Sequence, residues 1–191
     1  MDNNTVSRVS ALAGFNHFSS TGSGTAPLCL QEIPELHCYL VAAWPDTLGD
    51  VSQILMAHTG IETAPQAGQS CTGSQGSVLR VEPLKWWCFS QSIPGVGDDM
   101  ALGTVVDLSH SRTHVHISGA MAREFLNRFL PLDLRPEVFT VGSVAATAMH
   151  HCGVTLWRSE EGYELFLPRG FALSLWELML EIGQQFDVAV V

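Results

Sequence analysis

Charged residues are scarce in this sequence. Asp, Glu, Lys and Arg make up 15% of the 191 residues, whereas about 25% is usual in soluble domains. Apolar residues make up 46%, which is enough for a sizeable core in one compact domain or in two small lobes. Interfaces between subunits are depleted of charged side chains, so the shortage of charge is a first indication that part of the surface contacts another chain.

Basic residues are the scarcest charged type. Nine Lys and Arg stand against 19 Asp and Glu, the net charge is −10, and the nine are scattered along the chain. Because nucleic-acid-binding proteins contact phosphates with clustered Lys and Arg, we exclude nucleic acid as a partner. No apolar run is long enough to span a membrane. Asp2 and the lack of an apolar run after Arg8 argue against a secretory signal, and we expect a cytoplasmic protein.

The cysteines lack the spacing of a metal site or a disulfide scaffold. They are odd in number and contain no CxxC pair, and we expect reduced thiols. The five are Cys29, Cys38, Cys71, Cys88 and Cys152.

Residues 1–28 are predicted to form a flexible tail. The stretch from Ser19 to Gly24 is polar and cannot bury enough apolar area to become ordered by itself, so it is either disordered or laid along a partner. Residues 29–191 are predicted to form one domain, with an N-terminal lobe over 29–102 and a C-terminal lobe over 103–191.

Short strands and a few helices alternate along this domain, and the short links between strands favour an α+β fold. We expect a mixed or antiparallel sheet with two main helices. Strands are predicted at residues 36–44, 77–82, 86–91, 103–108, 113–117, 143–149, 153–158 and 163–167. Helices are predicted from Asp46 or Thr47 to His58, from Ser118 to Leu130, and over 169–186.

The last predicted helix is apolar on two faces, which indicates burial on both. Another subunit or the N-terminal lobe would cover the second face, and both alternatives stay open. The first face contains Phe171, Leu175, Leu178, Met179, Ile182 and Phe186. The second contains Leu173, Trp176 and Leu180.

Histidines form the most suggestive chemical pattern. His114 and His116 point to the same side of a strand, and with His110 or the His150-His151-Cys152 run they would imitate a zinc site. However, no spacing matches a known metal motif, and structural histidines are the simpler interpretation. A cysteine–histidine catalytic pair is an alternative that the sequence leaves open.

Other candidate motifs favour structural roles. Gly22-Ser23-Gly24 and Gly95-Val96-Gly97 lack the strand, spacing and helix of a phosphate loop, and we expect both to be flexible loops. Trp86 and Trp87 are more typical of core or interface anchors than of a platform for a planar ligand. We therefore predict no catalytic, cofactor-binding or metal-binding residue in this chain, and an apolar domain without such residues is typical of a subunit.

Several motifs in the second half occur in a recognisable order. They are Val106-Asp107-Leu108-Ser109-His110-Ser111-Arg112, Ile117-Ser118-Gly119, Pro131-Leu132-Asp133-Leu134-Arg135-Pro136, Phe139-Thr140-Val141-Gly142, and Leu167-Pro168-Arg169-Gly170-Phe171-Ala172 with Leu175-Trp176. Over residues 104–190 the chain resembles the gamma subunit of heterotetrameric sarcosine oxidase. The first hundred residues match less closely, and Glu82-Pro83-Leu84-Lys85-Trp86 stands where the family often has Gly-Pro-Asp-Glu-Trp.

The resemblance implies a fold similar to the folate-binding domain of aminomethyltransferase. It also implies a non-catalytic structural subunit in a complex with a large alpha subunit, a beta flavoprotein subunit and a small delta subunit. The complex would hold FAD, FMN, NAD and tetrahydrofolate on its other chains and would demethylate sarcosine or a similar N-methyl amino acid. Related N-methyl amino acid dehydrogenases have gamma-like chains that the sequence does not distinguish.

The alternative from another class of function is a stand-alone folate-binding or aminomethyltransferase-like protein. Such a protein needs a longer chain and an acid that holds the pterin ring. Asp107 is the candidate acid, but capping of the turn at Ser109 is its simpler role.

Overall fold

The computed structural model describes residues 9–14, 26–98 and 100–191, and contains two sheets. The strands of the larger sheet are β1 (Leu28–Ile33), β7 (Arg112–Ser118), β8 (Val144–Met149), β9 (Cys152–Arg158), β10 (Tyr163–Pro168) and β11 (Val188–Val190). They lie in the order β11-β1-β7-β10-β9-β8. Only the β1–β11 pair is parallel among the pairings of this sheet in the described chain.

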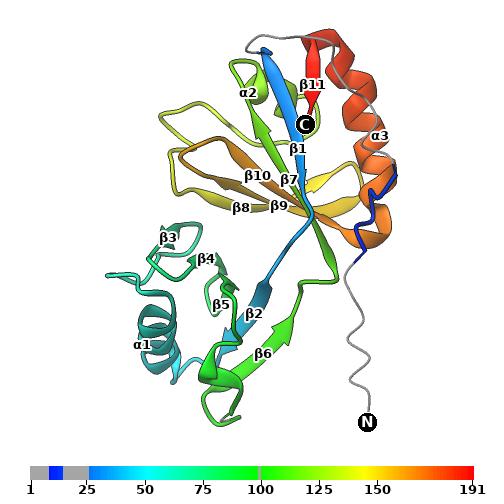
Figure 1. Ribbon diagram of the computed structural model, residues 1–191. Helices are drawn as coiled ribbons and strands as arrows, with labels where there is room; N and C mark the ends of the chain where they lie inside the picture. Colours follow the sequence, from blue (N-terminus) through cyan, green and yellow to red (C-terminus); the bar gives the residue numbers. More distant parts are fainter. Residues whose placement is uncertain (1–8, 15–25, 99) are drawn as a thin grey trace, which may run out of the picture.

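The smaller sheet is antiparallel. Its strands are β2 (Cys38–Ala43), β3 (Ser70–Thr72), β4 (Ser77–Glu82), β5 (Lys85–Phe89) and β6 (Gly103–Asp107), in the order β3-β4-β5-β2-β6. Figure 1 shows the two sheets one above the other, with α1 (Leu48–Thr59) beside the smaller sheet and α3 (Ala172–Gly183) beside the larger one. The α+β class and its two main helices are confirmed.

Helix α1 begins and ends where the sequence predicts. Thr47 is its N-terminal cap residue, and Gly60 ends it in the left-handed conformation at φ 72°. Glycine reaches that conformation without the steric penalty that other residues incur. The other described helical segments are α2 (Ala122–Leu126) and three 3-10 turns: η1 (Gly95–Asp98), η2 (Arg169–Phe171) and η3 (Gln184–Phe186).

The predicted helix over 118–130 is shorter than expected, although its buried stripe is confirmed. Ser118 still belongs to β7, and α2 ends at Leu126. The chain then tightens, because the Phe129 amide donates to the Leu126 carbonyl three residues back. All five residues of the predicted apolar stripe are buried: Ala122, Phe125, Leu126, Phe129 and Leu130.

The second apolar face of α3 is buried inside this chain. Trp176 is 0% exposed and Leu180 is 8% exposed, and Leu173 packs against the same core cluster. This cluster also contains Leu12, from the described segment 9–14, which runs along α3 in Figure 1. The interpretation that another subunit covers this face is therefore wrong for Trp176 and Leu180.

The two sheets do not follow the predicted boundary between the lobes at residues 102 and 103, because each sheet contains a strand from the other side of it. β1 lies before that point but pairs with β7 and β11 of the larger sheet, while β6 lies after it and pairs with β2 of the smaller sheet. Residues 103–108 and 113–117 do flank the predicted turn, in which the Ser111 amide donates to the Leu108 carbonyl. The chain passes from one sheet to the other at this turn (Figure 1).

Part of the predicted tail is ordered against the domain. Leu12 is fully buried, and the Ser10 hydroxyl donates to the carboxylate of Glu32 on β1. Leu28 is fully buried as the first residue of β1. The polar stretch from Ser19 to Gly24 lies outside the described residues. Among the described helices, none is long and apolar enough to cross a membrane.

An aromatic cluster joins the sheets. The Trp87 ring on β5 meets Phe166 on β10 edge to face, with centroids 5.5 Å apart. Phe89 stacks on Trp157 at 6.3 Å. Backbone bonds add to this contact, since the Val144 amide donates to Gly68 and the Ser70 amide donates to Gly142.

Candidate functional site

The predicted pair of strand histidines surrounds a buried carboxylate. His114 and His116 of β7 point to the same side of the sheet, and β10 places Glu164 directly opposite His116. Nε2 of His114 lies 2.7 Å from Glu164 Oε2, and Nδ1 of His116 lies 2.8 Å from Oε1. The Ser159 hydroxyl donates to Oε1 at 2.8 Å. Both oxygens of Glu164 are therefore occupied by side chains of this chain.

This arrangement controls the ionisation of Glu164, which is 7% exposed. Burial by itself would raise the pKa of the carboxyl, but hydrogen bonds from His114, Ser159 and His116 and the charge of His114 outweigh it and lower the pKa to about 2. A carboxylate held ionised in this way is a poor general acid or base near neutral pH. The sequence signal for this site was a lone Glu within the apolar strand that becomes β10.

The structure does not combine the histidines into a metal site. His110 is exposed in the turn before β7, and His150 and His151 are exposed in the turn between β8 and β9. Within the part of the chain that the structure describes, no group of three or more His, Cys, Asp or Glu residues is arranged to hold a metal ion.

The five cysteines are free. Burial raises the pKa of the Cys38 thiol and of the Cys88 thiol, which suppresses the nucleophilic thiolate. Cys88 is the thiol with a route to a histidine: its Sγ lies 3.6 Å from the Ser90 hydroxyl, which lies 3.0 Å from Nε2 of His58. Because Cys88 is 0% exposed, a substrate cannot reach it without opening the smaller sheet.

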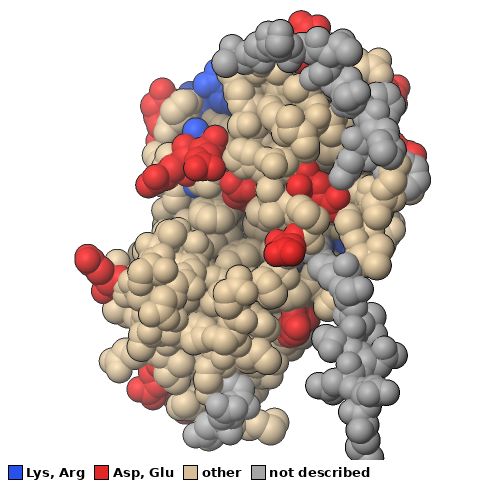
Figure 2. Space-filling view, viewed as in Figure 1, with Lys and Arg blue, Asp and Glu red and all other residues tan. Residues whose placement is uncertain are grey.

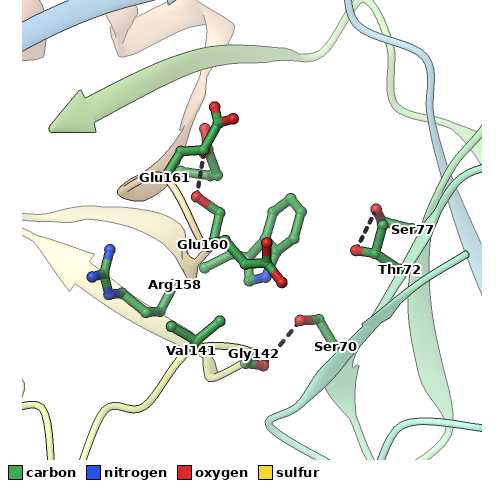
Figure 3. Close-up of a pocket in the computed structure, with 11 residues that line it drawn as sticks. Ser70, Thr72, Ser77, Val141, Gly142, Arg158, Glu160 and Glu161 are labelled. Carbon is green, nitrogen blue, oxygen red and sulfur yellow. Dashed lines mark hydrogen bonds between the residues drawn. The ribbon is translucent and has the colours of Figure 1, made fainter.

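A concavity of about 660 Å³ lies between the β9–β10 turn and the strands β3 and β4 (Figure 3). Glu164 and Trp157 contribute to its lining, as do the exposed carboxylates of Glu160 and Glu161. Arg158 is held at its edge, where it donates to the Gly162 carbonyl at 2.5 Å. The lining residues come from four separate segments, so no local motif would have predicted this concavity. Ser159 and Glu164 form a hydroxyl–carboxylate pair in its lining, but the lowered pKa of Glu164 makes this carboxylate a poor base.

The remaining sequence candidates have structural roles. Trp86 is fully buried in the core of the smaller sheet, and Trp87 belongs to the aromatic cluster between the sheets, as predicted. Gly95-Val96-Gly97 lies in η1, where Val96 is fully buried. Gly22-Ser23-Gly24 lies outside the described residues.

Asp107 caps the turn between β6 and β7, as predicted. The Ser109 amide donates to Asp107 Oδ1 at 2.8 Å. Partial burial opposes ionisation of Asp107, but the hydrogen bonds from Ser109 prevail and lower the pKa of the carboxyl. The Ser109 hydroxyl in turn accepts from the Cys38 amide at 3.1 Å. The Asp-x-Ser-His motif therefore fixes the crossing of the chain from one sheet to the other.

Gly119 in the Ile-Ser-Gly motif is required by its surroundings. Its φ is +100°, and a Cβ atom there would lie 2.4 Å from the Pro27 carbonyl oxygen. The Met121 amide donates to that same oxygen at 2.8 Å. Glycine at this position lets the chain leave β7 and pass close to the start of β1 before α2 begins.

Comparisons with known proteins give the sarcosine oxidase gamma subunit family and, over a shorter stretch, aminomethyltransferases. The model of the sarcosine oxidase, gamma subunit family, matches residues 90–184. The gamma subunit of sarcosine oxidase from Arthrobacter sp. is 29% identical over 157 residues, which cover 78% of this chain and 76% of the relative.

Two solved structures share the fold. A chain of the heterotetrameric sarcosine oxidase from Corynebacterium sp. U-96, solved with pyrrole 2-carboxylate, superposes with a TM-score of 0.80 at 23% identity, over 96% of this chain and 98% of the other. Aminomethyltransferase T of the glycine cleavage system from Bartonella henselae superposes with a TM-score of 0.60 at 17% identity, over 87% of this chain and 48% of the other. The expected similarity to the aminomethyltransferase fold is confirmed. With its Asp-x-Ser-His turn and Ile-Ser-Gly crossing inside the matched region, this chain belongs to the sarcosine oxidase gamma subunit family.

Proposed function

We propose that this chain is the gamma subunit of a heterotetrameric sarcosine oxidase and that its role is structural and non-catalytic. The observation that carries the second part is the state of its buried reactive groups, Glu164, Cys38 and Cys88. Both oxygens of Glu164 are occupied by His114, His116 and Ser159, and the thiols of Cys38 and Cys88 are buried with raised pKa values. Groups engaged in this way have no free partner for chemistry on a substrate.

In this proposal the other subunits perform the reaction. A large alpha subunit, a beta flavoprotein subunit and a small delta subunit would accompany this chain. FAD, FMN, NAD and tetrahydrofolate would be bound outside it. The complex would oxidise sarcosine or a similar N-methyl amino acid and transfer the one-carbon unit to tetrahydrofolate. This chain would hold the catalytic subunits in their arrangement.

The test is co-expression of this chain with the alpha, beta and delta subunits of the proposed complex. We expect a complex that contains this chain in stoichiometric amount, and a loss of intact complex when the chain is omitted. The variants His110→Ala, His150→Ala and Cys152→Ala are expected to leave turnover of the assembled complex within about threefold of the wild type. A variant among these that abolishes turnover in a fully assembled, flavin-loaded complex would contradict the non-catalytic role.

A second candidate function follows from the aminomethyltransferase fold: a stand-alone protein that binds folate and transfers one-carbon units. This chain spans 48% of the solved aminomethyltransferase, and Asp107 is already engaged as a cap. Calorimetric titration of the isolated chain with tetrahydrofolate separates the two functions. We expect no stoichiometric binding.

A further inference from the structure

We propose that β8 is the docking edge for another subunit, an extended segment of which adds to the larger sheet beside β8 and places an apolar side chain in the adjoining groove. This inference rests on the proposed function, because it takes the occupant from the same complex. Four observations lead to it: unpaired backbone groups, an edge without charge, a groove beside it and acidic residues at one end.

The outer edge of β8 has backbone groups without partners. The Val144 amide donates to Gly68 rather than to β9, whereas the preceding Ser143 carbonyl accepts from the amide of Arg158, the last residue of β9. Because N–H and C=O groups alternate in direction along a strand, those of Ala146 and Ala148 also point away from β9. Both residues are exposed, and no backbone bond from a described residue reaches these groups. They are available to a strand from another chain.

Nothing in the sequence protects this edge. Isolated proteins usually blunt exposed edge strands with charges, proline or short length. No Asp, Glu, Lys, Arg or Pro occurs from Val138 to Trp157. Among the other described edge strands, β3 and β11 have three residues each, and β6 ends in the charged Asp107. Gly68 already accepts from the outward Val144 amide, so the open part of β8 is the stretch that contains Ala146 and Ala148. This part has no charge and no proline, and cover by another chain explains why it lacks them.

The uncharged surface continues beyond β8. Residues 63–79 contain no Asp, Glu, Lys or Arg, and they meet the start of β8 through the Gly68–Val144 and Ser70–Gly142 bonds. Figure 2 shows the broad uncharged area over α1, β3 and β4 at the lower left of the view. Subunit interfaces have this depletion of charge at their centre.

A groove of about 470 Å³ adjoins the edge. It lies between β8 and β9 on one side and the smaller sheet on the other, with Ala146, Val154, Val81 and Trp87 among its lining. A Cβ atom on Gly153, which also lines it, would meet nothing within 4 Å. Strand addition commonly combines backbone bonds for affinity with a pocket for one side chain for specificity. Glu82, Lys85 and Arg112 also line the groove, and Glu82 and Lys85 form an ion pair with each other at 2.8 Å. The apolar part of the lining fits an aliphatic side chain of the added strand.

The charge around the edge indicates the kind of occupant. Glu160 and Glu161 are exposed in the turn that follows β9, whose residue Trp157 pairs with Val144 at one end of β8. The whole chain carries a net charge of −10. These carboxylates disfavour a second copy of the same acidic chain and favour a partner segment with Lys or Arg beside its apolar residues. We therefore assign the edge to a different subunit.

The experiment uses the complex co-purified with its flavoprotein subunits. Ala146→Pro and Ala148→Pro remove an outward N–H, which proline cannot supply to an added strand, at edge positions where proline does not break the bonds to β9. Gly153→Trp places an indole in the groove, at a position where a Cβ atom has no neighbour within 4 Å. Gly170→Trp is the matched control, because its site in η2 is exposed, lies outside the groove lining and is also free of neighbours within 4 Å. The thermal midpoint of each full chain alone shows that it folds.

We expect each of the three edge variants to weaken assembly by at least about tenfold, through the lost hydrogen bond or the blocked groove, while Gly170→Trp assembles normally. Hydrogen exchange should show the Ala146 and Ala148 amides unprotected in the free chain and protected in the complex. If the wild-type complex forms but the edge variants assemble normally and these amides stay unprotected, the docking edge is wrong and the proposed function stands. If the free chain dimerises with these amides protected, the occupant is a second copy and the assignment is wrong. If no complex forms with wild-type chain, the proposed function itself fails.

Discussion

Glu164 lies directly across the sheet from His116, and its Oε1 is 2.8 Å from Nδ1 of that histidine. The same oxygen accepts from Ser159, while the other oxygen lies 2.7 Å from His114. One carboxylate therefore ties β7, β10 and the turn before β10 together, and Glu164 belongs to the lining of the concavity of about 660 Å³. Its main effect is expected on stability.

Replacing Glu164 by Gln should destabilise the chain by about 1–3 kcal/mol at pH 7, because one amide oxygen cannot satisfy the donors that two carboxylate oxygens satisfy. The folded-state pKa of about 2 lies below the ordinary value of 4.5. The ionised form thus stabilises the chain above pH 4.5, and this contribution is lost as the pH falls from 4.5 to 2. Denaturant unfolding of wild type and Glu164→Gln across this window should show the difference shrinking. The control is Glu160→Gln, at an exposed position in the neighbouring turn, which should change stability little at any pH.

Gly119→Ala should destabilise the chain by about 2 kcal/mol or more, since it combines a positive φ with a Cβ atom 2.4 Å from the Pro27 carbonyl. Gly170→Ala is the matched control, because a Cβ atom there meets nothing within 4 Å. Thermal unfolding of the two variants measures the difference. Equal thermal midpoints would show that the close approach of Gly119 to Pro27 tolerates a side chain.

Trp176→Ala should destabilise the isolated chain by about 3–5 kcal/mol, because the indole is 0% exposed and its removal leaves a cavity. Phe171→Ala, at a position that is 56% exposed beside the same helix, should cost less than about 1 kcal/mol. Chemical unfolding of the single subunit is the measurement. A Trp176→Ala chain that is as stable as the wild type but fails to assemble would restore the discarded interpretation of this face as a subunit contact.

The thiols should react in two classes under native conditions. Cys38 and Cys88 are fully buried and burial raises the pKa of both, so a thiol reagent at pH 8 should modify them only on unfolding. Cys29, Cys71 and Cys152 are partly exposed and should react first. Mass spectrometry of the labelled peptides gives the order in which the five thiols react. Rapid labelling of Cys88 in the native chain would indicate that the smaller sheet opens.

Local signals in the sequence predicted the elements that they encode by themselves. The stripe that contains Phe125 and Leu126 was buried as expected, and Gly60 ended α1 because its left-handed conformation is a local property. The three-residue strands β3 and β11 gave no periodic signal, since alternation cannot be recognised over so few positions. Leu12 was assigned to a flexible tail, because the residues that bury it, Trp176 among its cluster, lie far away in the sequence and leave no signal near Leu12.

The candidate site was predicted only in part, for the same reason. Alternation along one strand placed His114 and His116 on one side, but register between strands decides that Glu164 lies between them. The two apolar faces of α3 correctly indicated double burial. They did not show whether the cover of Trp176 belongs to this chain or to another, because hydrophobicity carries no record of which chain supplies the contact.

The pairing of β1 also has a kinetic consequence. Leu28 pairs with Val188 and Leu30 pairs with Ile117, so the larger sheet depends on contacts between distant parts of the sequence. Folding slows as such contacts come to dominate, because long loops must close before the contacts stabilise them. The smaller sheet, whose strands β4 and β5 are joined by a short turn, should form first. Until Val188 joins, β1 and β8 both present open edges, and the chain is most prone to mispair during that interval.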